Sequence, residues 1–137
     1  MNQMEKKKIL VVDDDLDLVL SLKAFLKNQG FDVITALNKY EGMDQAKTEL
    51  PDLAILDVMM TYAHEGFDLA RDMRKDSRLK DIYIIMFTGI DKETGMNFKA
   101  NVGNPEIPAD GYIEKPVELH VLLDEINRVL AGEPKNE

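Results

Sequence analysis

The 137-residue sequence contains no cysteine and no tryptophan. Without cysteine the chain has no disulfide, no thiolate metal ligand and no cysteine nucleophile, which is compatible with a reducing cytoplasm, and a cytoplasmic location is our expectation. Basic residues are also scarce, because 17 Lys and Arg stand against 26 Asp and Glu, a formal net charge of -9. Nucleic acids and anionic membranes attract basic surfaces, so we expect neither as a direct partner.

The amino-terminal region lacks a long hydrophobic run. Three lysines at residues 6–8 precede only four apolar residues, ILVV at 9–12, before three aspartates. This run is too short for a signal-peptide core or a membrane span. The chain is 45% apolar and of a length that supports one hydrophobic core. We therefore expect a tail at residues 1–7, a single domain at 8–131 and a second tail at 132–137.

Four apolar runs dominate the remaining pattern, and each is followed by a polar group. They are residues 9–12 before Asp13, 53–56 before Asp57, 83–87 before Thr88, and 112–114 before Lys115. Continuous apolar, β-branched runs are typical of strands that are buried on both faces, as in a parallel sheet covered by helices. All strands of such a sheet end at one edge, where ligands bind. The sequence therefore predicts that these polar side chains converge.

Strands and helices are predicted to alternate along the chain. Helical spacing and stop signals indicate helices at 16–28, 39–49, 66–75 and 117–130, with strands at 8–12, 31–36, 53–57, 82–87 and 111–114. Leu50 is predicted on the inner face of the second helix and Leu119 in the apolar stripe of the last. Residues 91–101 form a weak helix prediction interrupted by Gly95, and 102–108 resemble a loop.

The three carboxylates of Asp13, Asp14 and Asp57 predict a magnesium site. Two like charges ~4 Å apart repel by about 1 kcal/mol in water and about 4 kcal/mol at an effective dielectric of ~20, so such a cluster needs a counter-ion. Mg²⁺ binds one or two carboxylates together with waters and a phosphate oxygen. Thr88 and Lys115 offer a hydroxyl and an ammonium for phosphoryl oxygens, and a carboxylate can form an acyl phosphate. Lys115 precedes Pro116, and a cis bond there would direct the lysine.

These motifs resemble the receiver domain of two-component response regulators. The resemblance rests on VVDD at 11–14, LDV at 56–58, FTG at 87–89 and ADGYIEKP at 109–116, and it covers about residues 7–131. It implies a flavodoxin-like doubly wound (βα)5 fold, with parallel strands in the order 2-1-3-4-5.

The resemblance also implies a role for each matching residue. Asp57 would be the phosphoacceptor, and Asp13 and Asp14 would hold Mg²⁺ together with the backbone carbonyl of Met59. Thr88 and Lys115 would bind phosphoryl oxygens, and Tyr112 would be the aromatic switch. The donor would be a sensor histidine kinase or a phosphotransfer protein, and the downstream target would be a protein of unknown identity that contacts the surface of the fourth helix, fifth strand and fifth helix. A phosphorylation-dependent homodimer is a further possibility.

The sequence departs from the family pattern in three places. Thr61 stands where the family usually has proline, the loop at 61–65 is one residue longer than usual, and the segment between Thr88 and Tyr112 is several residues longer. Met59 and Ile90 are apolar at two positions that tune loss of the phosphoryl group, and neither side chain can orient a water. We therefore predict slow self-dephosphorylation, which Met59→Asn should accelerate.

Two other functions remain open from the sequence. The first is a receiver-like protein-interaction module that phosphorylation no longer controls, for which the long segment before Tyr112 is the support. The second is an aspartyl-phosphate phosphatase of the haloacid dehalogenase type, because Asp13 and Asp15 after the first strand imitate that family's acid pair. The sequence shows no cap domain, and it lacks the acidic residues that partner the nucleophile late in the sequences of that family.

Overall fold

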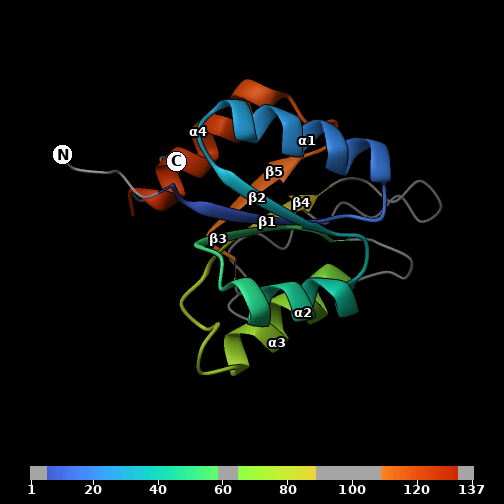
Figure 1. Ribbon diagram of the computed structural model, residues 1–137, viewed down its shortest axis with the longest axis vertical. Coiled ribbons are helices and arrows are strands. Elements are labelled where there is room, and N and C mark those ends of the chain that lie inside the picture. The colour runs from blue at the N-terminus through green and yellow to red at the C-terminus, as the bar shows by residue number, and fades with distance from the viewer. Residues whose placement is uncertain (1–5, 59–64, 89–108, 133–137) are drawn as a thin grey trace.

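Five parallel strands form one sheet in the order β2-β1-β3-β4-β5 (Figure 1), in a computed structural model that describes residues 6–58, 65–88 and 109–132. The strands are β1 (Lys8–Val12), β2 (Asp32–Ala36), β3 (Leu53–Asp57), β4 (Tyr83–Thr88) and β5 (Gly111–Glu114). This order confirms the flavodoxin-like doubly wound prediction. The order reverses between β1 and β3, and in open sheets of this kind ligands bind at that point, beyond the carboxyl ends of the strands.

Four helices lie within the described ranges, two on each face of the sheet (Figure 1). Helices α1 (Leu16–Asn28) and α4 (Leu119–Leu130) cover one face, and α2 (Lys39–Glu49) and α3 (Glu65–Lys75) cover the other. The predicted helix at 91–101 lies outside the described residues. No helix within the described ranges has the length and apolarity needed to cross a membrane.

Side-chain caps determine where the first two helices begin. The carboxylate of Asp15 accepts a hydrogen bond from the amide of Leu18 at 3.2 Å, and the side-chain oxygen of Asn38 accepts one from Glu41 at 2.9 Å. Each bond satisfies an amide that has no partner inside its helix. Asp15 is thereby a capping residue, and its carboxylate is directed at the start of α1.

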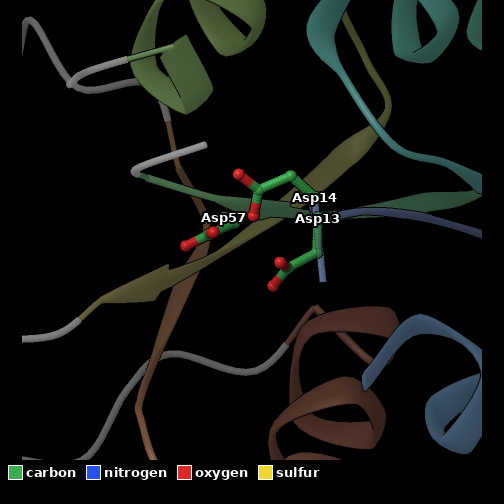
Figure 2. Close-up of side chains that lie close together, drawn as sticks. All are labelled: Asp13, Asp14 and Asp57. Carbon is green, nitrogen blue, oxygen red and sulfur yellow. The ribbon is translucent and has the colours of Figure 1, made fainter. Parts of the chain in front are cut away.

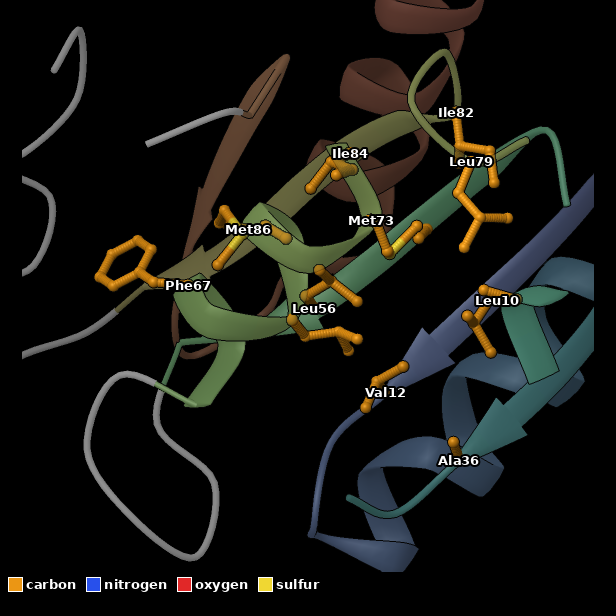
Figure 3. Close-up of a cluster of buried hydrophobic side chains, with 14 of the residues drawn as sticks. Leu10, Val12, Ala36, Leu56, Phe67, Met73, Leu79, Ile82, Ile84 and Met86 are labelled. Atoms are coloured by element: carbon orange, nitrogen blue, oxygen red, sulfur yellow. The ribbon is translucent and has the colours of Figure 1, made fainter. Parts of the chain in front are cut away.

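The strands separate two hydrophobic cores. One contains Leu10, Val12, Leu56 and Met86 together with Met73 of α3 (Figure 3). The other lies beneath α1 and α4 and contains the alternate residues Ile9, Val11, Leu53 and Ile55. Every side chain at 9–12 and 53–56 is therefore buried in one core or the other. Continuous apolar runs therefore belong to strands with both faces covered, as predicted.

The predictions that Leu50 and Leu119 lie on the core-facing sides of their helices were wrong. Leu50 follows α2 as its C-cap with a left-handed backbone at φ 48°, and 51% of its surface is exposed. This conformation ends the helical spacing and turns the side chain away from the core. Leu119 begins α4, two residues later than predicted, and is 39% exposed. Smaller differences are the start of β2 at Asp32, of β4 at Tyr83 and of α3 at Glu65.

Candidate functional site

Three carboxylates meet at the carboxyl edge of the sheet, at the point where the strand order reverses. Val12 of β1 pairs with Leu56 of β3, so the next residues, Asp13 and Asp57, leave neighbouring strands side by side. One carboxylate oxygen from each of Asp13, Asp14 and Asp57 lies within 4.8 Å of the others (Figure 2). Side chains separated by more than forty residues of sequence therefore form one acidic cluster.

Lys115 supplies the positive charge of this cluster from the end of β5. Its ammonium lies 2.9 Å from Oδ2 of Asp13 and 3.4 Å from Oδ2 of Asp57. Its backbone amide donates to the carbonyl of Thr88 at 2.7 Å, which holds the end of β5 against the end of β4. The ring of Phe87 lies 5.8 Å from the ammonium, within the range of a cation–π contact. The Lys115–Pro116 bond is cis.

The three carboxylates differ in their access to solvent. Asp13 is fully buried and Asp57 is 6% exposed, whereas Asp14 is exposed. Asp13 also accepts a hydrogen bond from the amide of Asp15 through Oδ1 at 3.0 Å, so both of its oxygens have partners. The cluster therefore consists of a fixed, buried acid, a nearly buried acid and an accessible acid.

Burial and mutual repulsion disfavour the ionised forms of the carboxylates in this cluster. Burial, together with the charge of Asp13, raises the pKa of Asp57 to about 7 in spite of Lys115. Desolvation and the charge of Asp13 also raise the pKa of Asp14. The pKa of Lys115 is raised because attraction to Asp57 and Asp13 outweighs its own desolvation, the largest opposing effect. One lysine therefore does not neutralise the three acids.

Thr88 ends β4, next to β3, and Tyr112 lies on β5, where it pairs with Met86 of β4. Thr88 is 1% exposed, and its hydroxyl is buried without a hydrogen-bond partner among the described residues. A buried hydroxyl without a partner costs about 1–3 kcal/mol, so it is expected to have one in another state of the protein. Tyr112 is half-buried against the core that contains Met86, and burial, with the charge of Asp110, raises the pKa of its hydroxyl.

The donor set fits a divalent cation. Carboxylate oxygens are the hard ligands that Mg²⁺ prefers, and the cluster has an excess of negative charge that such a cation would neutralise. Asp14 is accessible to solvent and Asp13 is buried, so a cation at this cluster would meet one accessible and one fixed carboxylate.

The predicted convergence of side chains is confirmed for Asp13, Asp14, Asp57 and Lys115. The backbone of Thr88 is bonded to that of Lys115 at the same edge of the sheet, and the convergence of the Thr88 hydroxyl stays a prediction. Met59, Thr61 and Ile90 lie outside the described residues. The sequence interpretation missed the ring of Phe87 beside Lys115, although its place at the end of an apolar strand was visible. It also missed Gly66, which lies against the backbone of Asp57 and for which the sequence offers no signal beyond a helix start.

A parallel sheet of this order is the flavodoxin-like doubly wound fold that CheY-like proteins have, and here an acidic cluster lies at its switch point. The family model described as the response regulator receiver domain matches residues 9–127, and the chain belongs to this family.

Individual relatives support this assignment. Protein PilH of Pseudomonas aeruginosa is 35% identical over 125 residues, which cover 91% of this chain and 98% of PilH. The alkaline phosphatase synthesis transcriptional regulatory protein PhoP of Bacillus subtilis is 39% identical over 110 residues, which cover 80% of this chain but 42% of PhoP. This chain therefore spans less than half the length of that relative. A crystal structure of a CheY-like receiver domain protein from Methanospirillum hungatei has a TM-score of 0.80 at 30% identity and covers 93% of this chain and 96% of that one.

Proposed function

We propose that this chain is a phosphorylation-dependent signalling domain in which Asp57 accepts a phosphoryl group. The observation that carries this proposal is the surroundings of Asp57, whose carboxylate has the oxygens of Asp13 and Asp14 within 4.8 Å and the ammonium of Lys115 at 3.4 Å. A carboxylate that is nearly buried, close to a cation and beside two further acids is suited to act as a nucleophile toward phosphorus.

The donor in this proposal is a phosphohistidine on a sensor histidine kinase or a phosphotransfer protein. An oxygen of Asp57 attacks phosphorus, an O–P bond forms, the P–N bond breaks, and the imidazole nitrogen leaves with a proton from solvent. Bound Mg²⁺ would neutralise charge on the transferring oxygens. Asp13, Asp14 and Asp57 would hold it, together with the carbonyl of Met59, which lies outside the described residues.

Lys115 and Thr88 are assigned to the phosphoryl oxygens. The ammonium of Lys115 already reaches Asp57, so an oxygen bound to that carboxylate falls within its range. The hydroxyl of Thr88 has no partner among the described residues, and a phosphoryl oxygen would satisfy it. Movement of Thr88 would leave room for Tyr112 to turn inward, and the changed surface would include β5, α4 and the segment at 91–101 outside the described residues.

This function makes the domain a substrate that assists its own modification, and it turns over no free metabolite. The proposal includes an unidentified protein as downstream target and dimerisation on phosphorylation as one form of output. It also places the domain at residues 8–131 and the protein in the cytoplasm, where a phosphohistidine donor and Mg²⁺ would be available together.

The test is the intact mass after incubation with acetyl phosphate and Mg²⁺. We expect one added phosphoryl group in the wild type and none in Asp57→Asn. Asp15→Asn is the matched control, because Asn also caps helices and Asp15 bonds to the amide of Leu18, so this variant should be phosphorylated normally. An unmodified wild type would favour an interaction module that phosphate does not control. Steady hydrolysis of a phosphomonoester that needs Asp13 but not Asp57 would favour a phosphatase.

A further inference from the structure

Helix α3 begins directly on the backbone of the proposed phosphoacceptor. Gly66, the second residue of α3, donates its amide to the carbonyl of Val58 at 3.1 Å. A Cβ atom at Gly66 would collide with the carbonyl oxygen of Asp57, and it would lie 2.7 Å from the carbonyl carbon of Asp57 and 2.9 Å from Cα of Val58. All three are backbone atoms, so a change of rotamer cannot relieve the collision.

Glycine is needed at residue 66 because there is no space for a side chain, and not because of its backbone angles. Among the described residues the glycines with positive φ are Gly30 and Gly132, and Gly66 is not one of them. An L-residue can therefore adopt the backbone angles of Gly66. Glycine is also a poor helix former, so local propensity favours almost any other residue here. What excludes a side chain is the distance between α3 and the end of β3.

Gly42 of α2 provides a comparison inside the same molecule. A Cβ there would lie 2.9 Å from Cδ2 of Leu69 and 3.1 Å from Cγ2 of Val12. Both neighbours are side-chain methyl groups that can move by a few tenths of an ångström. Gly42 is thus also tightly packed in a helix, but its contacts are with side chains of the core and not with the backbone of Asp57.

We propose that Gly66 is a positioning residue for Asp57, a role that rests on the function proposed above. Its missing side chain lets the first turn of α3 lie against the carbonyl of Asp57, while its amide holds the carbonyl of the next residue, Val58. These two contacts fix the backbone from which the Asp57 carboxylate reaches toward Asp13, Asp14 and Lys115. Gly66 itself does not touch the reacting atoms.

The first experiment compares Gly66→Ala with Gly42→Ala in the full chain. A methyl group at residue 66 must move the end of β3 and α3 apart by about 1 Å, and a displacement of that size costs up to about 100-fold in rate at a reacting group. We expect Gly66→Ala to lower the rate of phosphorylation by acetyl phosphate about 10- to 100-fold. Gly42→Ala should stay within about threefold of the wild type, at protein concentrations corrected for the folded fraction from urea titrations.

An unchanged rate in Gly66→Ala, or an equal loss in both variants, would overturn the positioning role. An unphosphorylated wild type would overturn the proposed function first, and with it this inference, so the two failures are distinguishable.

A second measurement uses the wild type and does not depend on whether Gly66→Ala folds. Hydrogen exchange is compared with and without Mg²⁺ at two glycine amides, that of Gly66, bonded to Val58, and that of Gly42, bonded to the carbonyl of Asn38 at 2.9 Å. Since Gly66 lies on the backbone of Asp57, we expect slower exchange at Gly66 and no change at Gly42 when Mg²⁺ binds. Equal responses at the two amides would contradict the proposal.

Discussion

The ammonium of Lys115 lies 2.9 Å from the carboxylate of Asp13, although the two residues are 102 positions apart in sequence. Asp13 is fully buried, and the Lys115 side chain is 32% exposed, so the pair connects the interior of the sheet to its surface. The same ammonium is 3.4 Å from Asp57. A single lysine therefore neutralises part of the charge on two buried acids that belong to different strands.

Replacing Lys115 with Gln should destabilise the protein at neutral pH. Removing one partner of a buried ion pair costs about 3–5 kcal/mol, but partial exposure of Lys115 and protonation of Asp57 reduce this, and we expect about 1–2 kcal/mol. The measurement is urea unfolding at pH 7.5 without Mg²⁺.

Lys39→Gln is the control for the Lys115 variant. Lys39 is 4.0 Å from Asp68, and both side chains are partly exposed, so its loss should change the free energy of unfolding by less than about 0.5 kcal/mol. If Lys115→Gln were as stable as Lys39→Gln, the buried acids would not need this cation.

The raised pKa of Asp57 predicts how stability depends on pH in the absence of metal. Between about pH 4 and about pH 7 the folded protein retains a proton on Asp57 that the unfolded chain has lost, so the contribution of Asp57 to stability falls as pH rises and levels off above pH 7. Asp57→Asn removes this cost. As pH rises across that range, we expect the free energy of unfolding of the variant to increase relative to that of the wild type by on the order of 2–4 kcal/mol, since each pKa unit is worth about 1.4 kcal/mol.

Urea unfolding of Asp57→Asn and wild type at pH 4, 5.5, 7 and 8.5 checks this prediction. Because all other titrating groups are shared, the difference between the two proteins isolates Asp57. Saturating Mg²⁺ should reduce the difference at pH 7 and 8.5, since under the proposed function it would bind the charged carboxylate and stabilise the folded wild type. A difference that stays constant from pH 4 to 8.5 would argue against a raised pKa.

The convergence of the site could be predicted from the sequence because topology alone determines it. Asp13 and Asp57 follow apolar runs, and all strands of a parallel sheet end at one edge, so the runs alone place both acids at that edge. Their direct proximity depends in addition on the pairing of β1 with β3. Lys115 follows from the same rule at β5. The family resemblance then supplied the strand order, which apolar patterning cannot determine.

The errors and omissions involve geometry that periodicity does not describe. Leu50 continues the helical spacing of α2, yet a left-handed backbone turns it outward, and spacing carries no information about where the last turn ends. Gly66 appears in the sequence only as a residue near a helix start. Its importance depends on the separation of backbone atoms in α3 and β3, which no local pattern encodes.

Replacing Thr88 with Val should leave the unphosphorylated protein as stable as the wild type, or more stable by up to about 1 kcal/mol. The hydroxyl of Thr88 is buried without a partner among the described residues, and removing such a group recovers its desolvation cost. Valine has nearly the same shape and fits the strand. Urea unfolding without phosphodonor is the measurement, and a loss of more than about 1 kcal/mol would show that the hydroxyl has a bond in this state.

Gly111 of the edge strand β5 lies close to Glu125 of helix α4. The energetic coupling between these two residues can be measured. A Cβ at Gly111 would collide with Oε2 of Glu125, the oxygen that accepts from the amide of Tyr112 at 3.2 Å and from Arg128 at 3.0 Å. Gly111→Ala must displace this carboxylate and break its bond to the strand, which we expect to cost about 1–3 kcal/mol. Glu125→Ala removes both the bond and the obstacle.

The double variant, Gly111→Ala with Glu125→Ala, should therefore be destabilised by less than the two single changes predict together. Residues in direct contact couple by about 0.5–3 kcal/mol, and here both single changes break the same bond to Tyr112, so we expect a coupling of at least about 1 kcal/mol. Urea unfolding of the four proteins completes the cycle. Additivity within about 0.3 kcal/mol would mean that the Glu125 carboxylate moves aside without loss, and that α4 is held to β5 mainly by apolar contacts such as those of Ile113 and Ile126 in the shared core.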